Sequence, residues 1–214
     1  MKKGLMLLVV ILLVVVGYKF MKTEAPVEEV VEETVEEVVM TDLSTLEAGE
    51  LTLDTETSVL KYTGKKLVGS HSGTVGLTSG SLTYDGENFT AGGFVVDMTT
   101  ISEEAGSESF VKHVASEDFF KVEEFSESSF ALTKVEQDEG VYTVTGDLTI
   151  LDKTNEISFP AAVTLTEGVL GATASFTIDR TLWGVTYGSG SFFEDLGDNA
   201  IDNDIAFELS LNFK

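Results

Sequence analysis

Strict alternation of apolar and polar side chains is the feature that most constrains the fold of this chain. In "YTVTGDLTI" the side chains of Tyr142, Val144, Leu148 and Ile150 share one face, and mostly polar residues occupy the other. "FVVDM", "ASFTIDR" and "FELSLNF" repeat the pattern. Because successive side chains of a strand point to opposite faces, this period of two predicts antiparallel strands with one buried face and one solvated face.

Short turn signals separate the strands. The dipeptides Asp85-Gly86, Glu139-Gly140 and Glu167-Gly168 favour tight turns between neighbouring runs. Evenly spaced, meandering strands leave exposed edges unless the sheet closes on itself, and a barrel of about eight strands has an interior that holds one narrow ligand. We therefore expect an all-β, antiparallel barrel, although the pattern is also compatible with a sandwich of two sheets.

One segment departs from this rhythm. In "ISEEAGSESFVKHVASEDFF", residues 101–120, the side chains of Phe110, Val111 and Val114 recur at helical spacing. Ser107 or Ser109 can cap the first turn. The sequence predicts a short helical insertion with its apolar face turned inward.

The N-terminal part precedes the strand pattern. Residues 1–22 begin with Met and two lysines, and their apolar run over residues 4–21 is near the lower limit of the roughly 17–25 residues of a membrane-spanning helix. It also suits a signal peptide, but no small-residue cleavage pattern follows, so we expect an uncleaved anchor in the cytoplasmic membrane. The remainder is then extracytoplasmic, in the periplasm or at the cell surface, and secreted if the segment is cleaved. Residues 23–44, rich in Glu and Val, predict an acidic linker, with a coiled-coil stalk as the alternative.

The charge and the absence of cysteine exclude several functions. The chain has 13 lysine and arginine residues against 37 aspartate and glutamate residues, a formal net charge of −24. Nucleic-acid binding requires a basic surface, and an anionic lipid surface would repel this chain. Without cysteine there is no disulfide, thiolate metal ligand or cysteine nucleophile.

The glycine-rich stretch "TGKKLVGSHSGTVGLTSGS", residues 63–81, does not match a phosphate-binding loop. That motif requires a glycine five residues before its Gly-Lys pair and Ser or Thr after it, whereas Val59 and Lys66 occupy these positions. The glycines are more typical of bulges and bends in a closing barrel. His71 is no base for its neighbouring serines, because adjacent strand side chains face opposite ways. We expect no metal site from His71 and His113, since no ligand spacing supports one.

Three motifs resemble the YceI-like family, also called polyisoprenoid-binding proteins. The first is "GKKLVGSHSGTVGLTSGSL". The second is "FVKHVASEDFFKVEEF", followed at a distance by "YTVTGDLTILDKTNEISFPAAV". The third is "FTIDRTLWGVTYGSGSFFEDLGDNAIDNDI". Their order and spacing cover residues 45–214. The family pattern usually has a proline after "DFF", where this chain has Glu124-Phe125-Ser126, so the local turn is expected to differ.

The resemblance implies an extended, lipocalin-like barrel over residues 45–214, with an apolar tube for an isoprenoid chain. It implies a carrier without catalysis or cofactor, whose partner is an isoprenoid lipid such as a quinone or a polyprenyl phosphate. Burial of apolar surface, worth about 25 cal/mol per Å², would supply the affinity. Two other interpretations stay open: a structural or stress-related surface protein without ligand, and a hydrolase or isomerase acting inside the barrel.

Candidate ligand-binding residues come from inward strand faces, from the helical insertion and from the third motif. Arg180, beside Asp179, predicts an ion pair that fixes a strand end, and the alternative is a contact with the polar head of a ligand. Trp183 and Tyr187 are expected to close the barrel end or to touch the ligand. The acidic run "EDLGDNAIDND" lacks calcium-loop spacing and predicts a solvated loop. The full candidate set is His71, His113, Phe94, Phe119, Phe176, Arg180, Trp183 and Tyr187.

Overall fold

The computed structural model describes residues 41–138 and 140–214. The predicted membrane segment, residues 4–21, lies outside these residues, as does the predicted linker up to residue 40. Within the described ranges, no helix has both the length and the apolar character needed to cross a membrane.

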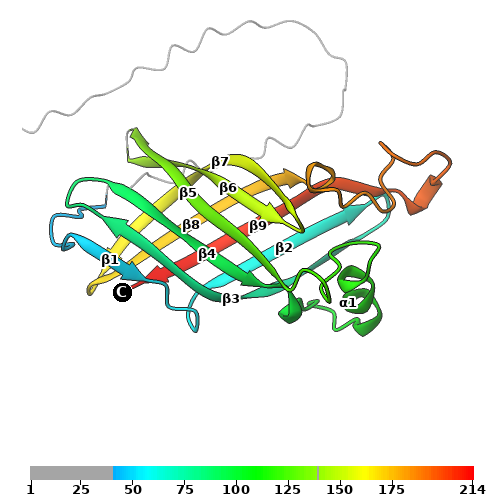
Figure 1. Cartoon of the computed structure of the whole chain (residues 1–214), viewed down its shortest axis with the longest axis horizontal. Coiled ribbons are helices and arrows are strands. Elements are labelled where there is room, and N and C mark those ends of the chain that lie inside the picture. Colours follow the sequence, from blue (N-terminus) through cyan, green and yellow to red (C-terminus); the bar gives the residue numbers. More distant parts are fainter. Residues whose placement is uncertain (1–40, 139) are drawn as a thin grey trace, which may run out of the picture. The chain divides into compact units, whose positions relative to one another are not determined.

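The described part of the chain is a barrel built almost entirely of strands (Figure 1). One α-helix, α1 (Glu108–Ala115), and the short 3₁₀ segments η1 (Met98–Thr100), η2 (Arg180–Trp183) and η3 (Gly197–Asn199) interrupt them. The strands are β1 (Gly49–Thr52), β2 (Val59–Lys66), β3 (Ser70–Tyr84), β4 (Phe89–Asp97), β5 (Glu127–Asp138), β6 (Val141–Ile150), β7 (Lys153–Thr166), β8 (Val169–Asp179) and β9 (Ile201–Phe213).

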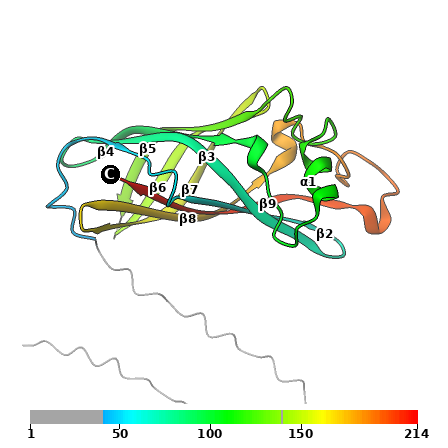
Figure 2. The same ribbon diagram turned by 90° about the horizontal axis from the view of Figure 1, so that it is seen from below.

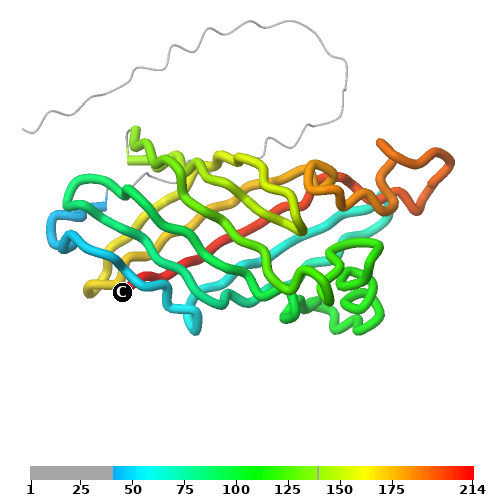
Figure 3. The backbone as a smooth tube through the Cα atoms, in the orientation of Figure 1, coloured from blue at the N-terminus to red at the C-terminus, as the bar shows by residue number. Residues whose placement is uncertain are grey.

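Eight of these strands close into a ring. The sheet order is β1-β3-β2-β9-β8-β7-β6-β5-β4, and β3 also pairs with β4, which joins the two sides of the sheet. β1 pairs with the part of β3 that lies beyond its pairing with β2, so it extends the wall. The tube in Figure 3 shows the strands crossing the barrel obliquely. The predicted closed antiparallel barrel is confirmed, and the sandwich is wrong.

The predicted helical insertion is α1, which follows η1 in the connection between β4 and β5. The Ser107 side chain caps it by accepting a hydrogen bond from the backbone N–H of Phe110. Val114 is buried, and Phe110 and Val111 are partly buried, so the predicted face turns inward. Helix α1 and the β8–β9 connection lie at one end of the barrel, here called the mouth end, while the C-terminus and β1 lie at the other, the far end (Figures 1 and 2).

The glycine-rich 63–81 stretch contains a bulge, as predicted, where Thr78 of β3 is an extra residue opposite the Val95–Val96 step of β4. The pairing of β2 with β9 also shifts register between Gly64 and Lys66, but the extra residues there belong to β9. A Cβ atom on Gly73 would lie 1.9 Å from the carbonyl oxygen of Ser102, so only glycine permits this close approach of the β4–β5 connection to β3.

The ring of strands closes within the described residues. Its hydrogen-bonded ladder runs from Gly49 to Phe213, and its buried apolar residues run from Leu53 to Phe213. Large apolar side chains alternate inward on every long strand, which is why this part of the chain forms a core by itself.

Candidate functional site

Three cavities follow one another along the barrel interior. The far cavity and the middle cavity each leave about 90 Å³ of free space, and both contain Phe94 and Leu209 in their walls. The mouth cavity is larger, about 350 Å³, and shares Tyr62, Val114 and Phe120 with the middle cavity. Because neighbouring cavities share wall residues, they form one interrupted tube.

The far and middle cavities are lined almost wholly by apolar side chains. Five phenylalanines from β4, β5, β7, β8 and β9 form a belt between them, here called the phenylalanine belt. The ring centroids of successive members are 5.5, 5.6, 4.3 and 5.6 Å apart. Its members, in order, are Phe94, Phe130, Phe159, Phe176 and Phe207. These rings narrow the tube at its middle.

The mouth cavity has polar and basic groups in its wall besides apolar side chains, whereas the other two are almost wholly apolar. Lys65 and Lys66 both contribute to its wall, although neighbouring residues of a regular strand face opposite ways. Both residues lie where β2 leaves the ladder for the β2–β3 turn: its pairing with β3 ends at Lys65, and the N–H of Lys66 donates to the carbonyl of Gly69. Asp202 is the acidic residue that contributes to this wall in the described part of the chain.

Arg180 adds a buried positive charge to the mouth cavity. Only 2% of its surface is exposed, and its guanidinium donates hydrogen bonds to the carbonyl oxygens of Asp202 (3.0 Å), Val185 (2.6 Å) and Ile201 (3.2 Å). The guanidinium also lies 5.9 Å from the centre of the Phe119 ring. Burial lowers the pKa of Arg180, and the nearby charges of Asp179 and Asp202 oppose this effect.

The ion pair predicted between Arg180 and Asp179 is wrong. The Asp179 carboxylate instead accepts hydrogen bonds from the backbone N–H of Thr181 (2.9 Å) and from its hydroxyl (2.6 Å), and so caps η2. Adjacent side chains at a strand end point in different directions, which sends the guanidinium into the barrel end and the carboxylate away from it. Backbone carbonyls therefore stabilise this cation, with no carboxylate within 4.0 Å in the described chain.

His71 connects strand β3 to the cap of α1. Its Nδ1 lies 3.0 Å from Glu103 Oε1, and its ring stacks on Phe110 with centroids 4.0 Å apart. The other oxygen of Glu103 accepts a hydrogen bond from the N–H of Ser107 (2.9 Å). These hydrogen bonds, the one from Ser107 first, lower the pKa of the Glu103 carboxyl. Burial and, secondarily, the charge of Glu103 raise the pKa of Tyr62 to about 12, so its phenol stays neutral and donates to Ser102.

A second aromatic cluster joins α1 to the β8–β9 connection. The ring of His113 meets Phe119 and Tyr187 edge to face, with centroids 5.1 and 4.9 Å apart, and Phe119 lies 5.1 Å from Tyr187. His113 Nε2 also lies 3.1 Å from Asp118. All three rings line the mouth cavity, so they tie its two walls together.

The family of the chain follows from a comparison of its sequence with family models. The model of the YceI-like domain matches residues 51–213. The chain belongs to the YceI-like family. The match contains every strand of the barrel except the first two residues of β1, so the confirmed resemblance covers the fold described above. No curated protein sequence matches the chain significantly.

Solved structures similar to this YceI-like chain share its fold at low identity. Burkholderia cenocepacia BcnA matches with a TM-score of 0.64 and 17% identity over 75% of this chain and 98% of its own. A polyisoprenoid binding domain from Saccharophagus degradans, implicated in plant cell wall breakdown, matches with a TM-score of 0.60 and 12% identity over 78% of this chain and 99% of its own. The Campylobacter jejuni YCEI protein has a TM-score of 0.50 and 14% identity over 89% and 97%.

The YceI-like barrel brings most of the predicted site residues to its cavities. Phe94 and Phe176 belong to the phenylalanine belt, and the mouth cavity gathers five others. Trp183 lines none of the three cavities: it is 1% exposed, donates from its indole N–H to the Leu148 carbonyl (2.9 Å), and belongs to a buried cluster with Ile150 and Ile178. The five in the mouth cavity are His71, His113, Phe119, Arg180 and Tyr187.

Sequence reasoning missed other residues of the site. Lys65 and Lys66 were not among the predicted site residues, because nothing in the local sequence shows that the end of β2 lines the mouth cavity. Phe130 and Phe159 follow the apolar–polar alternation of β5 and β7, so their inward position could have been predicted from the sequence. The acidic run is exposed as expected at Glu194, Asp195, Asp198, Asp202 and Asp204, but only its first part is a loop, because Asp202 and Asp204 belong to β9.

Proposed function

We propose that the barrel binds one isoprenoid-type lipid, with its tail in the far and middle cavities and its polar head in the mouth cavity. The observation that carries this proposal is the polarity of the interrupted tube: two apolar cavities lie behind a mouth bearing Lys65, Lys66 and Arg180. The Saccharophagus relative, a polyisoprenoid binding domain with the same fold, supports the same class of ligand.

The tail would bind by removal of apolar surface from water. Each buried Å² contributes about 25 cal/mol, and a long prenyl chain offers such surface along its whole length. The far and middle cavities, at about 90 Å³ each, are smaller than the roughly 300–1,000 Å³ of typical ligand pockets. Uptake of the tail therefore requires the phenylalanine belt to part, and rotation of its rings about χ1 provides that motion.

The head would meet positive charge and aromatic faces. Arg180 is held in place by three carbonyl oxygens and needs no rearrangement to stay charged near the cavity. Lys65 and Lys66 are exposed and can adjust to the head. This arrangement suits the oxygens of a polyprenyl phosphate or of a prenyl quinone.

The proposed place of action is outside the cytoplasm, with residues 4–21 as a membrane anchor. Protease treatment of intact cells or spheroplasts, followed by immunoblotting, tests this part separately. Degradation of the barrel with retention of the N-terminal segment in the membrane fraction is expected, and protection of the barrel until the cells are lysed would contradict it.

Extraction of the purified protein with organic solvent, followed by mass spectrometry, tests the ligand class. A prenyl quinone or polyprenyl phosphate is expected at up to one molecule per barrel. Titration of delipidated protein with a prenyl quinone provides a second readout, because Phe176 and Phe207 of the middle cavity pack against the buried cluster that contains Trp183, the only tryptophan. A bound quinone should quench Trp183 fluorescence, whereas a polyprenyl phosphate should not. Repeated recovery of no lipid, together with no uptake of either lipid, would overturn the proposal and favour a structural role.

A further inference from the structure

Exposed apolar side chains concentrate at the mouth end of the barrel. Within the described residues, the five most exposed large apolar side chains all belong to the turns and connections of this end. Those at the far end are Val59, Val141 and Val169, each only 38–39% exposed. The five are Leu67 (68%), Val68 (67%), Leu182 (59%), Phe192 (57%) and Phe193 (48%).

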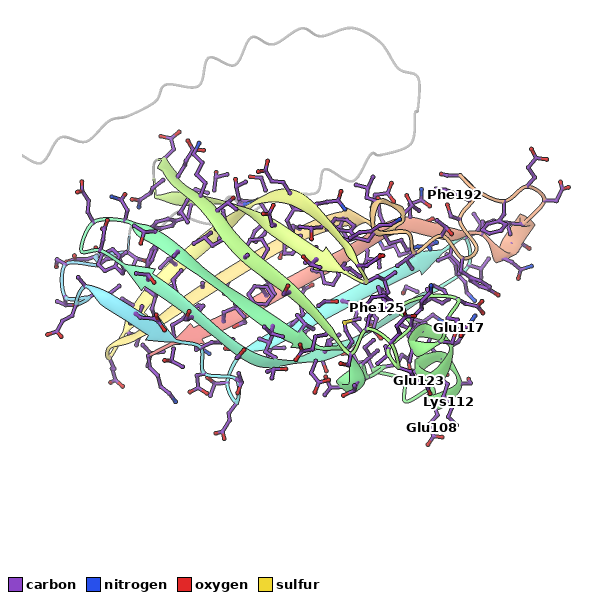
Figure 4. All side chains as sticks on the ribbon, viewed as in Figure 1. Glu108, Lys112, Glu117, Glu123, Phe125 and Phe192 are labelled. Carbon is purple, nitrogen blue, oxygen red and sulfur yellow. The ribbon has the colours of Figure 1, made fainter. Side chains whose placement is uncertain are left out.

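Four of these side chains form what we call the apolar rim: Leu67 and Val68 in the β2–β3 turn, and Phe192 and Phe193 in the β8–β9 connection. Figure 4 labels Phe192 on this connection, at the end that carries α1. The two segments are neighbours, since the N–H of Leu67 donates to the carbonyl of Ala200 (3.4 Å). The rim also adjoins the mouth cavity, because Lys65 and Lys66 precede Leu67 directly and both line that cavity.

Hydrogen bonds hold the rim in its exposed arrangement. The N–H groups of Phe192 and Phe193 both donate to the carbonyl of Ser189, each at 3.0 Å. Ser189 is fully buried, and its hydroxyl donates to Asn203 (2.6 Å). On the other segment, the N–H of Lys66 donates to the Gly69 carbonyl (3.1 Å). These hydrogen bonds fix the backbone of the β8–β9 connection while the rings of Phe192 and Phe193 stay exposed to solvent. Exposed apolar surface gathered in one region is typical of an interaction site.

We propose that the apolar rim docks on the surface of a phospholipid bilayer, so that the mouth cavity faces the lipid that it takes up or delivers. Docking itself is inferred from the rim, while its role in lipid transfer rests on the proposed function. Charges of both signs surround the rim, with Lys65 and Lys66 on one side and Glu194 and Asp195 following Phe193. The rim would therefore bind the bilayer by burying its apolar side chains. We expect it to prefer a zwitterionic bilayer, because an anionic lipid surface repels a chain of net charge −24.

Flotation with vesicles of phosphatidylcholine alone tests the docking. The experiment uses residues 41–214, because the predicted anchor would bind vesicles by itself and because the barrel is complete in these residues. The rim variants are Leu67→Ser with Val68→Ser, and Phe192→Ser with Phe193→Ser. The control variant is Val141→Ser with Val169→Ser, which removes exposed apolar side chains from the far end.

The unmodified domain and the control should float with the vesicles, and each rim variant should lose at least about tenfold in partition coefficient, since transfer of one such side chain out of water is worth more than a factor of ten. Adding anionic phospholipid should weaken the binding. No flotation of the unmodified domain, equal partition of rim and control variants, or binding that requires anionic lipid would each overturn the proposal. A dimer in analytical ultracentrifugation that only the rim variants lose would also overturn it, because a second copy would then cover the rim.

Quinone uptake separates this inference from the proposed function. With prenyl quinone dispersed in detergent, rim variants should reach the same final quench of Trp183 as the unmodified domain. With quinone supplied in phosphatidylcholine vesicles, their uptake should be at least about tenfold slower. If the unmodified domain floats but takes up no quinone or polyprenyl phosphate from either source, the proposed function fails and the docking stands. If uptake from vesicles proceeds equally fast in all variants, the role of the rim in transfer is wrong.

Discussion

The ring of Phe94 faces the ring of Phe130 across the β4–β5 pair, with centroids 5.5 Å apart and planes 28° from parallel. Phe94 is also in the walls of both the far and the middle cavity. Together with Leu209, Phe94 thus stands between two apolar spaces that a prenyl tail would have to occupy together.

Phe94→Ala should join these two cavities. We expect the free energy of unfolding to fall by about 3 kcal/mol, typical of phenylalanine truncation in a core, while the rate of prenyl quinone uptake rises. Phe89→Ala is the matched control, because Phe89 lines the far cavity without bordering the middle one. Urea unfolding and stopped-flow quenching of Trp183 measure the two effects. Equal uptake rates in the two variants would show that the belt does not limit entry.

Arg180→Lys should destabilise the mouth end. Lysine keeps the charge but lacks the planar fork that reaches the carbonyls of Asp202, Val185 and Ile201. Each buried acceptor left without a donor costs about 1–3 kcal/mol, so we expect a loss of about 3 kcal/mol in urea unfolding. Lys134→Met, which breaks the exposed pair of Lys134 with Glu136, should change stability by less than about 1 kcal/mol. Similar losses in both variants would mean that the carbonyl bonds contribute little.

Gly73→Ala should disturb the close approach of the β4–β5 connection to β3. The added methyl group would meet the Ser102 carbonyl at 1.9 Å, and relief of this overlap requires a backbone shift. We expect a loss of about 1–3 kcal/mol in thermal unfolding. Gly64→Ala is the control, because a Cβ there has no neighbour within 4 Å, and its effect should stay within about 0.5 kcal/mol. The reverse order of the two stabilities would refute this account.

Acid should loosen the tie between β3 and α1. The folded-state pKa of Glu103 lies below its ordinary value of 4.5, so the carboxylate contributes stability that is fully present above that pH and is lost as the pH falls through the lowered pKa. Hydrogen exchange of α1 amides, corrected for intrinsic rates, should accelerate over this acid range. In Glu103→Gln the acceleration should be present already at neutral pH, whereas Glu117→Gln, at an exposed position, should behave as the unmodified protein. Unchanged α1 protection in Glu103→Gln would contradict this role.

Much of the site followed from local patterns. The inward positions of Phe94 and Phe176 were predictable because a strand places alternate side chains on one face. The Ser107 cap was predictable for a similar reason, since a helix start exposes N–H groups that a nearby hydroxyl satisfies. Membership of the YceI-like family was recognisable from motifs spread over the barrel, and the family model confirms it.

The sequence by itself determined the strands, the short helix and the inward row of apolar side chains, because these depend on residues adjacent in the chain. Only the tertiary structure decided which of these side chains meet and which cavities they line. The pairing of the strands around the closed barrel brings five phenylalanines into a belt that divides the tube, and it places Lys65 and Lys66, at the end of β2, in the wall of the mouth cavity. Arg180 finds carbonyls instead of Asp179 for the same reason: its partners, from residues 185, 201 and 202, become neighbours only after the barrel has closed.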